Sequence, residues 1–280
     1  MKKHKYLLFA TLIWTLTPSS PLPASAQEQE TRWGESLSIA QKEKATMFAI
    51  GSANVLDTYL SAEKYHGTEF RIVTNTRKPL SKRQLIQSIA HQGAFTTVEN
   101  RAKNSNELGA MYHFSYALRR HWAPSSPWLI EAGGGIDAHL GMLYNTRNSN
   151  NPVQAYAAIH LSPSVAVSYR QRLWHRNITL RYVAKAPLIG IMFSPNYGQS
   201  YYEIFSRGNY DHNIVPTTIV STPSLCHAAT IDIQLKKSNP RSFLRLGYLG
   251  DYQQSNINHL KRHHYSHLFL IGWAKTLSSP

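Results

Sequence analysis

The sequence predicts an all-β protein, an antiparallel transmembrane β-barrel of about ten strands, with twelve strands as the alternative. Three observations lead to this prediction. Apolar and polar residues alternate with a period of two, several alternating segments exceed ten residues, and the N-terminus has the pattern of an export signal. A tilted strand needs about 9–11 residues to cross a bilayer, whereas an average strand has five or six.

The N-terminus predicts a signal peptide over residues 1–26. Lys2, Lys3 and Lys5 precede a short apolar stretch from Tyr6 to Leu16, and Ala24-Ser25-Ala26 then supplies small residues for cleavage. That apolar stretch is too short to span a bilayer as a helix. We expect an N-terminal periplasmic segment over 27–44 and a barrel domain over 45–280.

The alternation divides most later segments into two faces. Between Trp128 and Leu143, the apolar residues Ile130, Ile136, Leu140 and Met142 share one face, while Glu131, Gly133, Gly135, Asp137 and His139 share the other. Charged residues on an inward face suit a wet lumen better than a dry core. Since sheet edges cannot be satisfied in hydrocarbon, the sheet is expected to close. The run Gly133-Gly134-Gly135 lies within a strand, where it permits close approach of a neighbour or a bend.

Ten strands are expected, and the lengths of their connections set their direction. With the N-terminus in the periplasm, tight turns such as Leu173 to Arg176 lie on the periplasmic side, and the polar loop Tyr144 to Val153 and the long segment Ile191 to Ser224 lie on the outer side. A strand pair within Ile204 to Val220 would raise the total to twelve. The ten expected strands are 45–55, 66–76, 84–98, 107–119, 127–143, 154–171, 177–190, 225–236, 241–253 and 263–275.

Composition limits the partners. The formal net charge of +15 favours anionic partners, which for an exported chain means outer-membrane lipid phosphates or lipopolysaccharide and not nucleic acid. The single cysteine, Cys226, excludes an intrachain disulfide. No phosphate-binding loop is found, and neither a cofactor nor an oligomer is expected, so the protein is predicted to be a monomer.

Two His-x-Ser pairs are the candidate catalytic residues. His113 and Ser115 share the inward face of one strand, as do His160 and Ser162, so that an imidazole stands beside a hydroxyl and can accept its proton. Glu131 or Asp137 on the next strand is the candidate group that orients His113.

The His113/Ser115 pair resembles the His-x-Ser pair of barrel lipid hydrolases, the outer-membrane phospholipases and lipid A deacylases. The resemblance implies hydrolysis of acyl esters. It covers few residues, and Tyr116 follows the serine where those families usually have an asparagine.

Histidines also gather near the C-terminus, where His263 and His267 are the candidate metal ligands. They share a face if a strand begins there, and imidazole binds several transition metals. No carboxylate accompanies them locally. The alternative is a group of surface histidines beside Lys261 and Arg262 that binds no metal.

Two further segments carry a resemblance that spans most of the mature chain. Asn54 to Leu60 followed by Gly67-Thr68-Glu69, and the segment Ser194 to Glu203, resemble uncharacterised exported proteins of Bacteroidetes-type bacteria that are predicted to be outer-membrane β-barrels. The resemblance implies the fold and the compartment but no mechanism.

Three functions are compatible with these observations. The leading one is a non-enzymatic outer-membrane barrel with a structural, binding or transport-related role. The first alternative is an outer-membrane lipid hydrolase that uses His113 and Ser115, and the second is a soluble periplasmic β-sandwich that binds a ligand. The ligand, the openness of the lumen and the role of Ile191 to Ser224 are left open by the sequence.

Overall fold

A computed structural model describes residues 42–80, 84–125, 127–236 and 239–277, and all statements below concern these residues. They form twelve strands and one short helix, α2 (Tyr201–Phe205). The strands are β1 (Lys42–Asp57), β2 (Ser61–Leu80), β3 (Leu85–Asn100), β4 (Asn106–Ser125), β5 (Trp128–Asn145), β6 (Val153–Leu173), β7 (Arg176–Lys185), β8 (Ile189–Phe193), β9 (Ile214–Thr218), β10 (Leu225–Lys236), β11 (Asn239–Ile257) and β12 (Leu260–Leu277).

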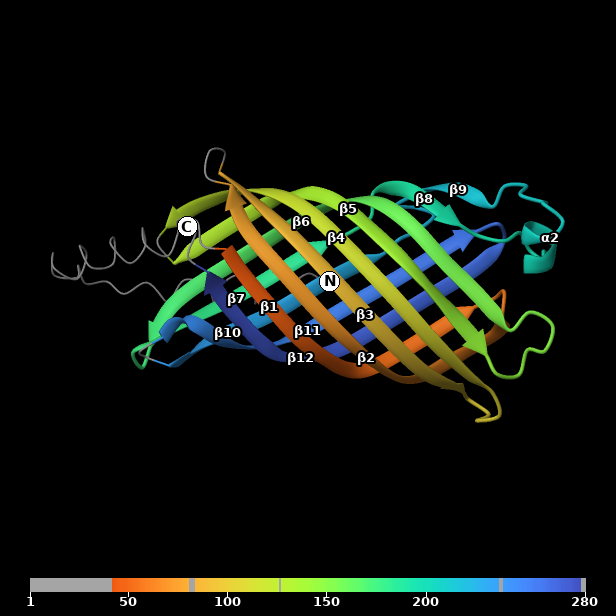
Figure 1. Ribbon diagram of the computed structural model, residues 1–280, viewed down its shortest axis with the longest axis horizontal. Helices are drawn as coiled ribbons and strands as arrows, with labels where there is room; N and C mark the ends of the chain where they lie inside the picture. Colours follow the sequence, from red (N-terminus) through yellow and green to blue (C-terminus); the bar gives the residue numbers. More distant parts are fainter. Residues whose placement is uncertain (1–41, 81–83, 126, 237–238, 278–280) are drawn as a thin grey trace, which may run out of the picture. The chain divides into compact units, whose positions relative to one another are not determined.

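Ten of these strands close into an antiparallel barrel (Figure 1). Consecutive strands pair with each other from β1 to β7 and again from β10 to β12. The ring is completed where β7 pairs with β10 and β12 pairs with β1. The prediction of a closed ten-stranded barrel is therefore confirmed. A sandwich of two packed sheets is not what this part of the chain forms.

Two predicted boundaries need correction. β1 begins at Lys42, which places the last residues of the expected N-terminal segment 27–44 within the barrel wall; residues 1–41, with the predicted signal peptide, lie outside the described part. The seventh strand was expected to continue to residue 190, but β7 ends at Lys185. Pro187 follows closely and has no N–H for the ladder, so the strand is interrupted there.

Beyond Pro187 the chain resumes along the same edge of β6 as β8, which pairs with β9. The expectation of a strand pair within Ile204 to Val220 is half right, since β9 lies in that segment but its partner β8 precedes it. Neither strand belongs to the closed ring. With α2 they extend from the end of the barrel opposite the first residues of β1 (Figure 1).

The predicted faces are confirmed by the exposure of their side chains. Glu131, Asp137, His113, Asp232 and Arg245 are buried within the barrel. The outer wall carries exposed apolar and aromatic side chains, including Phe48, Ile72, Phe95, Ile136, Leu140, Ile159, Leu180, Phe269 and Trp273. An apolar belt around a charged interior is the pattern of a barrel in lipid.

The glycines of β5 permit a close approach between strands, as predicted. A Cβ on Gly135 would overlap the carbonyl oxygen of Tyr116, and a Cβ on Gly133 would overlap that of Leu118. These positions on β5 therefore admit no side chain without movement of β4.

Among the described residues, no helix has the length and apolar character needed to cross a membrane.

Candidate functional site in the barrel lumen

One buried carboxylate organises the lumen near the end where β1 begins. Glu131 on β5 receives Arg77 Nη2 at 2.6 Å, Arg119 Nε at 3.0 Å and Arg181 Nη1 at 2.9 Å. These arginines stand on β2, β4 and β7, so a single side chain connects strands on different walls of the barrel. Charge-assisted bonds of this kind are short and strong, and here they cross the lumen.

A second charged cluster lies beside the first. Arg245 on β11 contacts Asp232 on β10 through Nε at 2.6 Å and Glu43 on β1 through Nη2 at 2.6 Å. All three strands are close neighbours in the ring, so this cluster stiffens one wall and contributes less to crossing the lumen.

Farther along the axis, a third cluster again joins distant strands. Arg71 on β2 contacts Asp251 on β11 at 2.8 Å and Glu69 at 2.6 Å. Glu69 also accepts a hydrogen bond from Ser266 at 2.8 Å and contacts His264 Nε2 at 2.7 Å. Glu69 is completely buried, and these partners supply the hydrogen bonds that a buried carboxylate requires.

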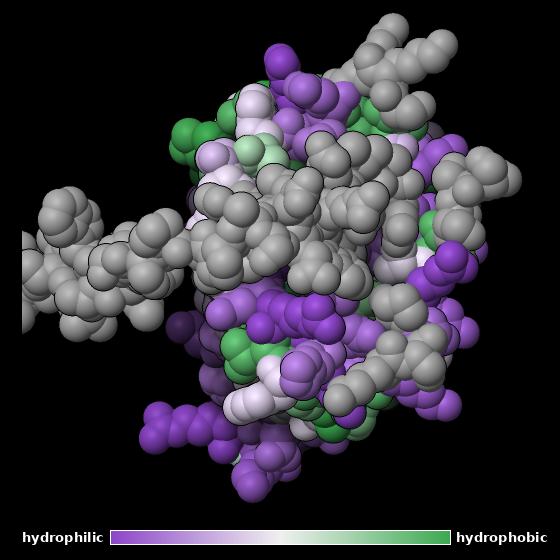
Figure 2. All heavy atoms as spheres, turned by 90° about the vertical axis from the view of Figure 1, so that its left-hand side faces the viewer, coloured by the Kyte–Doolittle hydropathy of each residue, from purple (hydrophilic) through white to green (hydrophobic). Residues whose placement is uncertain are grey.

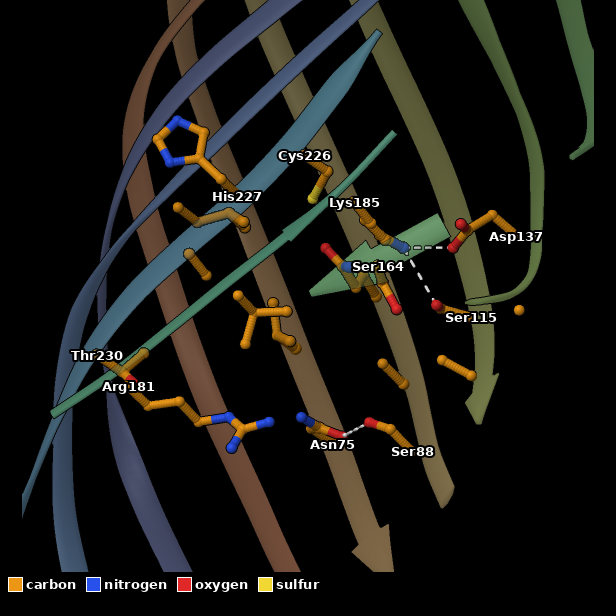
Figure 3. Close-up of a pocket in the computed structure, with 18 of the residues that line it drawn as sticks. Asn75, Ser88, Ser115, Asp137, Ser164, Arg181, Lys185, Cys226, His227 and Thr230 are labelled. Atoms are coloured by element: carbon orange, nitrogen blue, oxygen red, sulfur yellow. Dashed lines mark hydrogen bonds and ion pairs between the residues drawn. The ribbon is translucent and has the colours of Figure 1, made fainter. Parts of the chain in front are cut away.

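The sequence-predicted catalytic residues are only partly brought together. His113 Nε2 lies 3.3 Å from Asp137 Oδ1, so Asp137 is the acid beside His113. Lys185 on β7 forms an ion pair with Asp137 and donates to Ser115 Oγ at 3.1 Å (Figure 3). Glu131, the other candidate acid, belongs to the arginine cluster described above.

This arrangement differs from a hydrolytic triad. His113 Nε2 faces Asp137 and, at 3.4 Å, Lys185 Nζ, and no hydrogen bond joins His113 to Ser115 among those of the described residues. An ammonium donates hydrogen bonds and accepts none, so Lys185 holds Ser115 as an acceptor. The catalytic roles of His113, Ser115, Glu131 and Asp137 stay a prediction.

The second pair, His160 and Ser162, lies next to this cluster. His113 stacks on His139 with ring centroids 3.9 Å apart, and His139 in turn meets the ring of His160 edge to face. The three histidines line a small cavity of about 30 Å³, large enough for water but not for a lipid chain.

A larger cavity of about 140 Å³ lies between the arginine cluster and Lys185 (Figure 3). Its polar side includes Arg119, Arg181 and Lys185, and in Figure 3 the guanidinium group of Arg181 extends across the space toward Asn75. Its apolar side consists of Met47, Val73, Leu249 and Leu270, which belong to one buried cluster on the inner wall of β1, β2, β11 and β12.

The lumen is filled again toward the end that carries α2. Arg262 lies over the ring of Tyr156, 3.7 Å from its centroid, and its Nε lies 3.8 Å from Asp57 Oδ2. A buried apolar cluster adjoins this layer and includes Val55, Leu60, Tyr65, Val98 and Leu143.

The segment between β8 and β9 folds into a compact cap, defined here as residues 194–213. Asn213 Nδ2 donates to Gln199 Oε1 at 2.7 Å, and Asn258 on the β11–β12 turn donates to the carbonyl oxygen of Ser194 at 3.2 Å. Tyr201 OH donates to Gln154 Oε1 on β6 at 2.8 Å. The cap is therefore bonded to the wall of the barrel on two sides.

The candidate metal ligands lie on the outer wall. His263 and His267 share a face, as expected, but His263 Nε2 contacts Asn54 Oδ1 at 2.8 Å and His267 Nδ1 contacts Tyr248 OH at 2.6 Å. Within the described ranges, no group of three or more histidine, cysteine or acidic residues is arranged to hold a metal ion. A metal role for this pair stays a prediction.

Sequence reasoning missed the residues that cross the lumen. Arg71, Arg77 and Lys185 were not singled out, because their partners stand two or more strands away in the ring. The signal that was available is the placement of these cations on inward positions of strands that also carry inward acids.

Solved structures with a similar architecture are outer-membrane barrels. The outer membrane protease OmpT from Escherichia coli has a TM-score of 0.45 and 6% identity, with 85% of this chain and 96% of that chain covered. The translocator domain of the autotransporter NalP from Neisseria meningitidis has a TM-score of 0.40 and 6% identity, with 91% and 97% covered. These likenesses concern architecture alone.

A major outer membrane protein from Thermus thermophilus shows the same kind of likeness, with a TM-score of 0.34, 10% identity, and 83% and 99% of the two chains covered. A search of curated protein sequences finds no match. A family model described as a protein of unknown function, DUF3316, matches residues 6–279, and the chain belongs to this family.

Proposed function

We propose that this chain is an exported outer-membrane barrel that does not conduct, and that its role is structural or binding. The observation that carries the proposal is the set of ion pairs across the lumen. Glu131 holds arginines from β2, β4 and β7, and Arg71 joins β2 to β11. A ten-stranded barrel has little free interior, and these side chains occupy it.

A channel assay tests this proposal. Folded protein in planar lipid bilayers should give no stepwise conductance. The variant Arg71→Ala/Arg77→Ala/Glu131→Ala/Asp251→Ala removes the Arg71–Asp251 and Arg77–Glu131 bridges and leaves Arg119, Arg181 and Glu69 without these partners. Where it still folds, it should conduct. Steady conductance steps from the wild-type protein would overturn the proposal, whatever the variant does.

The membrane orientation forms part of the proposal. The described strands of the ring have 10 to 21 residues, and a bilayer needs about 9–11 from each. The end where β1 begins has tight turns such as Trp174-His175, whereas the other end carries the loop at residues 146–152 and the cap. Short periplasmic turns and longer outer loops are typical of bacterial barrels, so we place the end where β1 begins in the periplasm.

Exposed cations occur at both ends of the described barrel, and the end that carries the cap has Lys64, Arg101, Lys103, Arg147, Arg207 and Lys261. The end where β1 begins has exposed cations and no exposed acid among the described residues, which points to an anionic lipid partner there. Exposed cations mark many strand ends on the proposed periplasmic rim: Lys44, Lys78, Arg120, Arg176, Lys236, Arg241 and Lys275. Among the described residues, the exposed acids Glu63, Glu99 and Asp211 all lie toward the opposite end. Figure 2 looks onto the end that carries the rim, and hydrophilic residues predominate among the residues that it colours by hydropathy.

We therefore propose that the rim contacts phosphate groups of anionic phospholipids in the periplasmic leaflet. Lys44, Lys78, Arg120 and Lys275 occupy outward positions of their strands, where long cationic side chains reach the headgroups. Aromatic anchors stand nearby, since Trp122 and Trp273 are each two residues from a rim cation and are exposed. The lipopolysaccharide leaflet would face the opposite end.

Tryptophan quenching by brominated lipid tests whether anionic phospholipid binds at the rim or at the opposite end of the barrel. In vesicles of phosphatidylcholine, brominated phosphatidylglycerol should quench more strongly than brominated phosphatidylcholine. Lys44→Gln/Lys78→Gln/Lys275→Gln should remove the difference, and the control Lys64→Gln/Arg101→Gln/Lys103→Gln should not. A loss confined to the control would place the lipid preference at the opposite end and contradict the rim.

The protein is further proposed to act as a monomer without catalysis. This proposal is supported by the position of Lys185 between His113 and Ser115 and by an outer wall that is apolar around the ring.

A further inference from the structure

The larger lumen cavity has the composition of a binding site for an amphiphile. Met47, Val73, Leu249 and Leu270 give it an apolar wall, and the guanidinium groups of Arg119 and Arg181 stand on another side. Its volume of about 140 Å³ is close to that of engineered protein cavities of about 150 Å³ that accept benzene. A single ring or a short chain is therefore the largest apolar group that fits.

The cations beside this cavity outnumber the acids that neutralise them. Arg77, Arg119 and Arg181 share Glu131 alone as their ion-pair partner in the first cluster. In the second cluster, the single charge of Arg245 faces two acids, Glu43 and Asp232. The two clusters together therefore hold four arginines and three carboxylates, a formal excess of one positive charge. Lys185 and Asp137 also line the cavity, and these two charges offset each other.

The first cluster also retains donor capacity. A guanidinium group has five N–H donors, and Arg119, which lines the cavity, uses Nε for Glu131 and Nη1 for Ser164 Oγ in the hydrogen bonds of the described residues. Excess positive charge in a space of low dielectric attracts an anion more strongly than the same charge at a surface.

We propose that this cavity binds a small amphiphilic monocarboxylate, with its apolar part against Met47, Val73, Leu249 and Leu270 and its carboxylate toward Arg119 and Arg181. One negative charge offsets the formal excess of the two clusters, and the apolar wall disfavours an inorganic anion. This inference goes beyond the proposed structural role and requires only that the barrel is folded.

Arg181 is the side chain that decides the preference for an anion. Its Nη1 and Nη2 contact Glu131 at 2.9 and 3.1 Å, and Nη1 also donates to Ser168 Oγ at 2.9 Å. The group is thus held in place by fixed partners while it lines the cavity (Figure 3). A preorganised cation loses little conformational entropy when a ligand binds.

Equilibrium dialysis with radiolabelled benzoate tests the proposal on detergent-folded full-length protein. Wild-type protein should show a single saturable site, with benzyl alcohol as a much weaker competitor. Arg181→Gln should weaken benzoate binding about tenfold or more, because a charge-assisted bond is lost. The matched control Arg101→Gln removes an exposed arginine of the β3–β4 turn and should leave the affinity unchanged.

A second variant keeps the charges and fills the space. Ala228 lines the cavity, and Ala228→Phe should abolish benzoate binding in protein whose gel mobility still changes on boiling. The proposal is overturned if the folded wild type shows no saturable uptake, if benzyl alcohol binds as tightly as benzoate, or if Arg181→Gln binds like Arg101→Gln. Conductance plays no part in these outcomes, so they are independent of the proposed sealed lumen.

Discussion

At the scale of single residues, Glu131 has the largest structural role in the lumen. It is fully buried and holds three arginines from different strands at 2.6–3.0 Å. Neither the carboxylate nor the guanidinium groups would be stable alone in the buried lumen, since burying an unpaired charge costs more free energy than the ion pair gains. These contacts give Glu131 a structural role, and its role as a candidate acid for catalysis stays a prediction.

Loss of this carboxylate should destabilise the barrel. We expect Glu131→Gln to lower the free energy of unfolding by about 3 kcal/mol, because three guanidinium groups lose the negative charge that they share and one of its two acceptor oxygens. Urea unfolding in lipid vesicles, followed by tryptophan fluorescence, measures the change. Glu99→Gln is the control, since Glu99 is exposed and lies 3.7 Å from Lys103, and it should cost less than about 0.5 kcal/mol. Equal stability of the two variants would contradict the role of Glu131.

The faces of the strands could be predicted from the sequence, but the contacts across the lumen could not. Alternation alone places Glu131, Asp137 and His113 inward, and the pairing of β4 with β5 brings Asp137 opposite Ser115. Which cation crosses to each acid depends on how the ring closes and on the stagger of its strands, and neither is encoded in a local pattern. For this reason Lys185 could not be placed beside Asp137 from the sequence.

At the scale of elements, the strands were the most predictable part and the cap the least. Ten long alternating segments became the ten strands of the ring, because a period of two over such lengths admits no other regular structure. The cap depends instead on turns and on single contacts such as Asn213 with Gln199. Its short helix α2 has only five residues, too few for an amphipathic period to show.

The cap should be the first part of the described chain to open. Ser200 and Glu203 form a reciprocal capping box at the start of α2, and Ile204 is fully buried beneath it. Ile204→Ala should cost the cap about 2–4 kcal/mol of local stability. Limited proteolysis should then cleave within 194–213 faster, while Tyr202→Ala, at an exposed position, should not change the rate. Unchanged cleavage in Ile204→Ala would show that the cap does not depend on this contact.

High pH should loosen the same region. Burial raises the pKa of Tyr59 to about 12, and burial also raises the pKa of Tyr201. Because the pKa of each phenol is higher in the folded state than in the unfolded state, its contribution to stability is complete below about pH 10 and is lost as pH rises toward 12.

Difference titration of tyrosinate absorbance checks this. The difference between the titration curves of the wild type and Tyr59→Phe gives the tyrosinate absorbance of Tyr59, which should appear well above pH 10. Tyr197→Phe removes an exposed phenol of the cap and is the control for loss of a tyrosine. Tyr59 stands on the β1–β2 turn and meets the ring of Tyr201 edge to face, with centroids 5.6 Å apart. Titration of Tyr59 at its ordinary pKa would contradict the burial of this side chain against the cap.

At the scale of the whole barrel, the distribution of side chains favours one position in a membrane. The outer wall is apolar and aromatic, the rim where β1 begins is basic, and the interior is bridged by ion pairs. Soluble monomeric proteins rarely expose so many contiguous apolar side chains, and an apolar patch of that extent marks an interaction surface. The proposed contact with lipid would account for such a surface on every side of the ring.

The most direct test of this account is the fate of the full-length protein in the cell envelope. After fractionation, it should be recovered in the outer membrane, resist carbonate extraction and migrate differently on a gel before and after boiling, as a closed barrel does. Recovery as a soluble periplasmic species, with the same mobility before and after boiling, would contradict the assignment of the apolar wall to lipid.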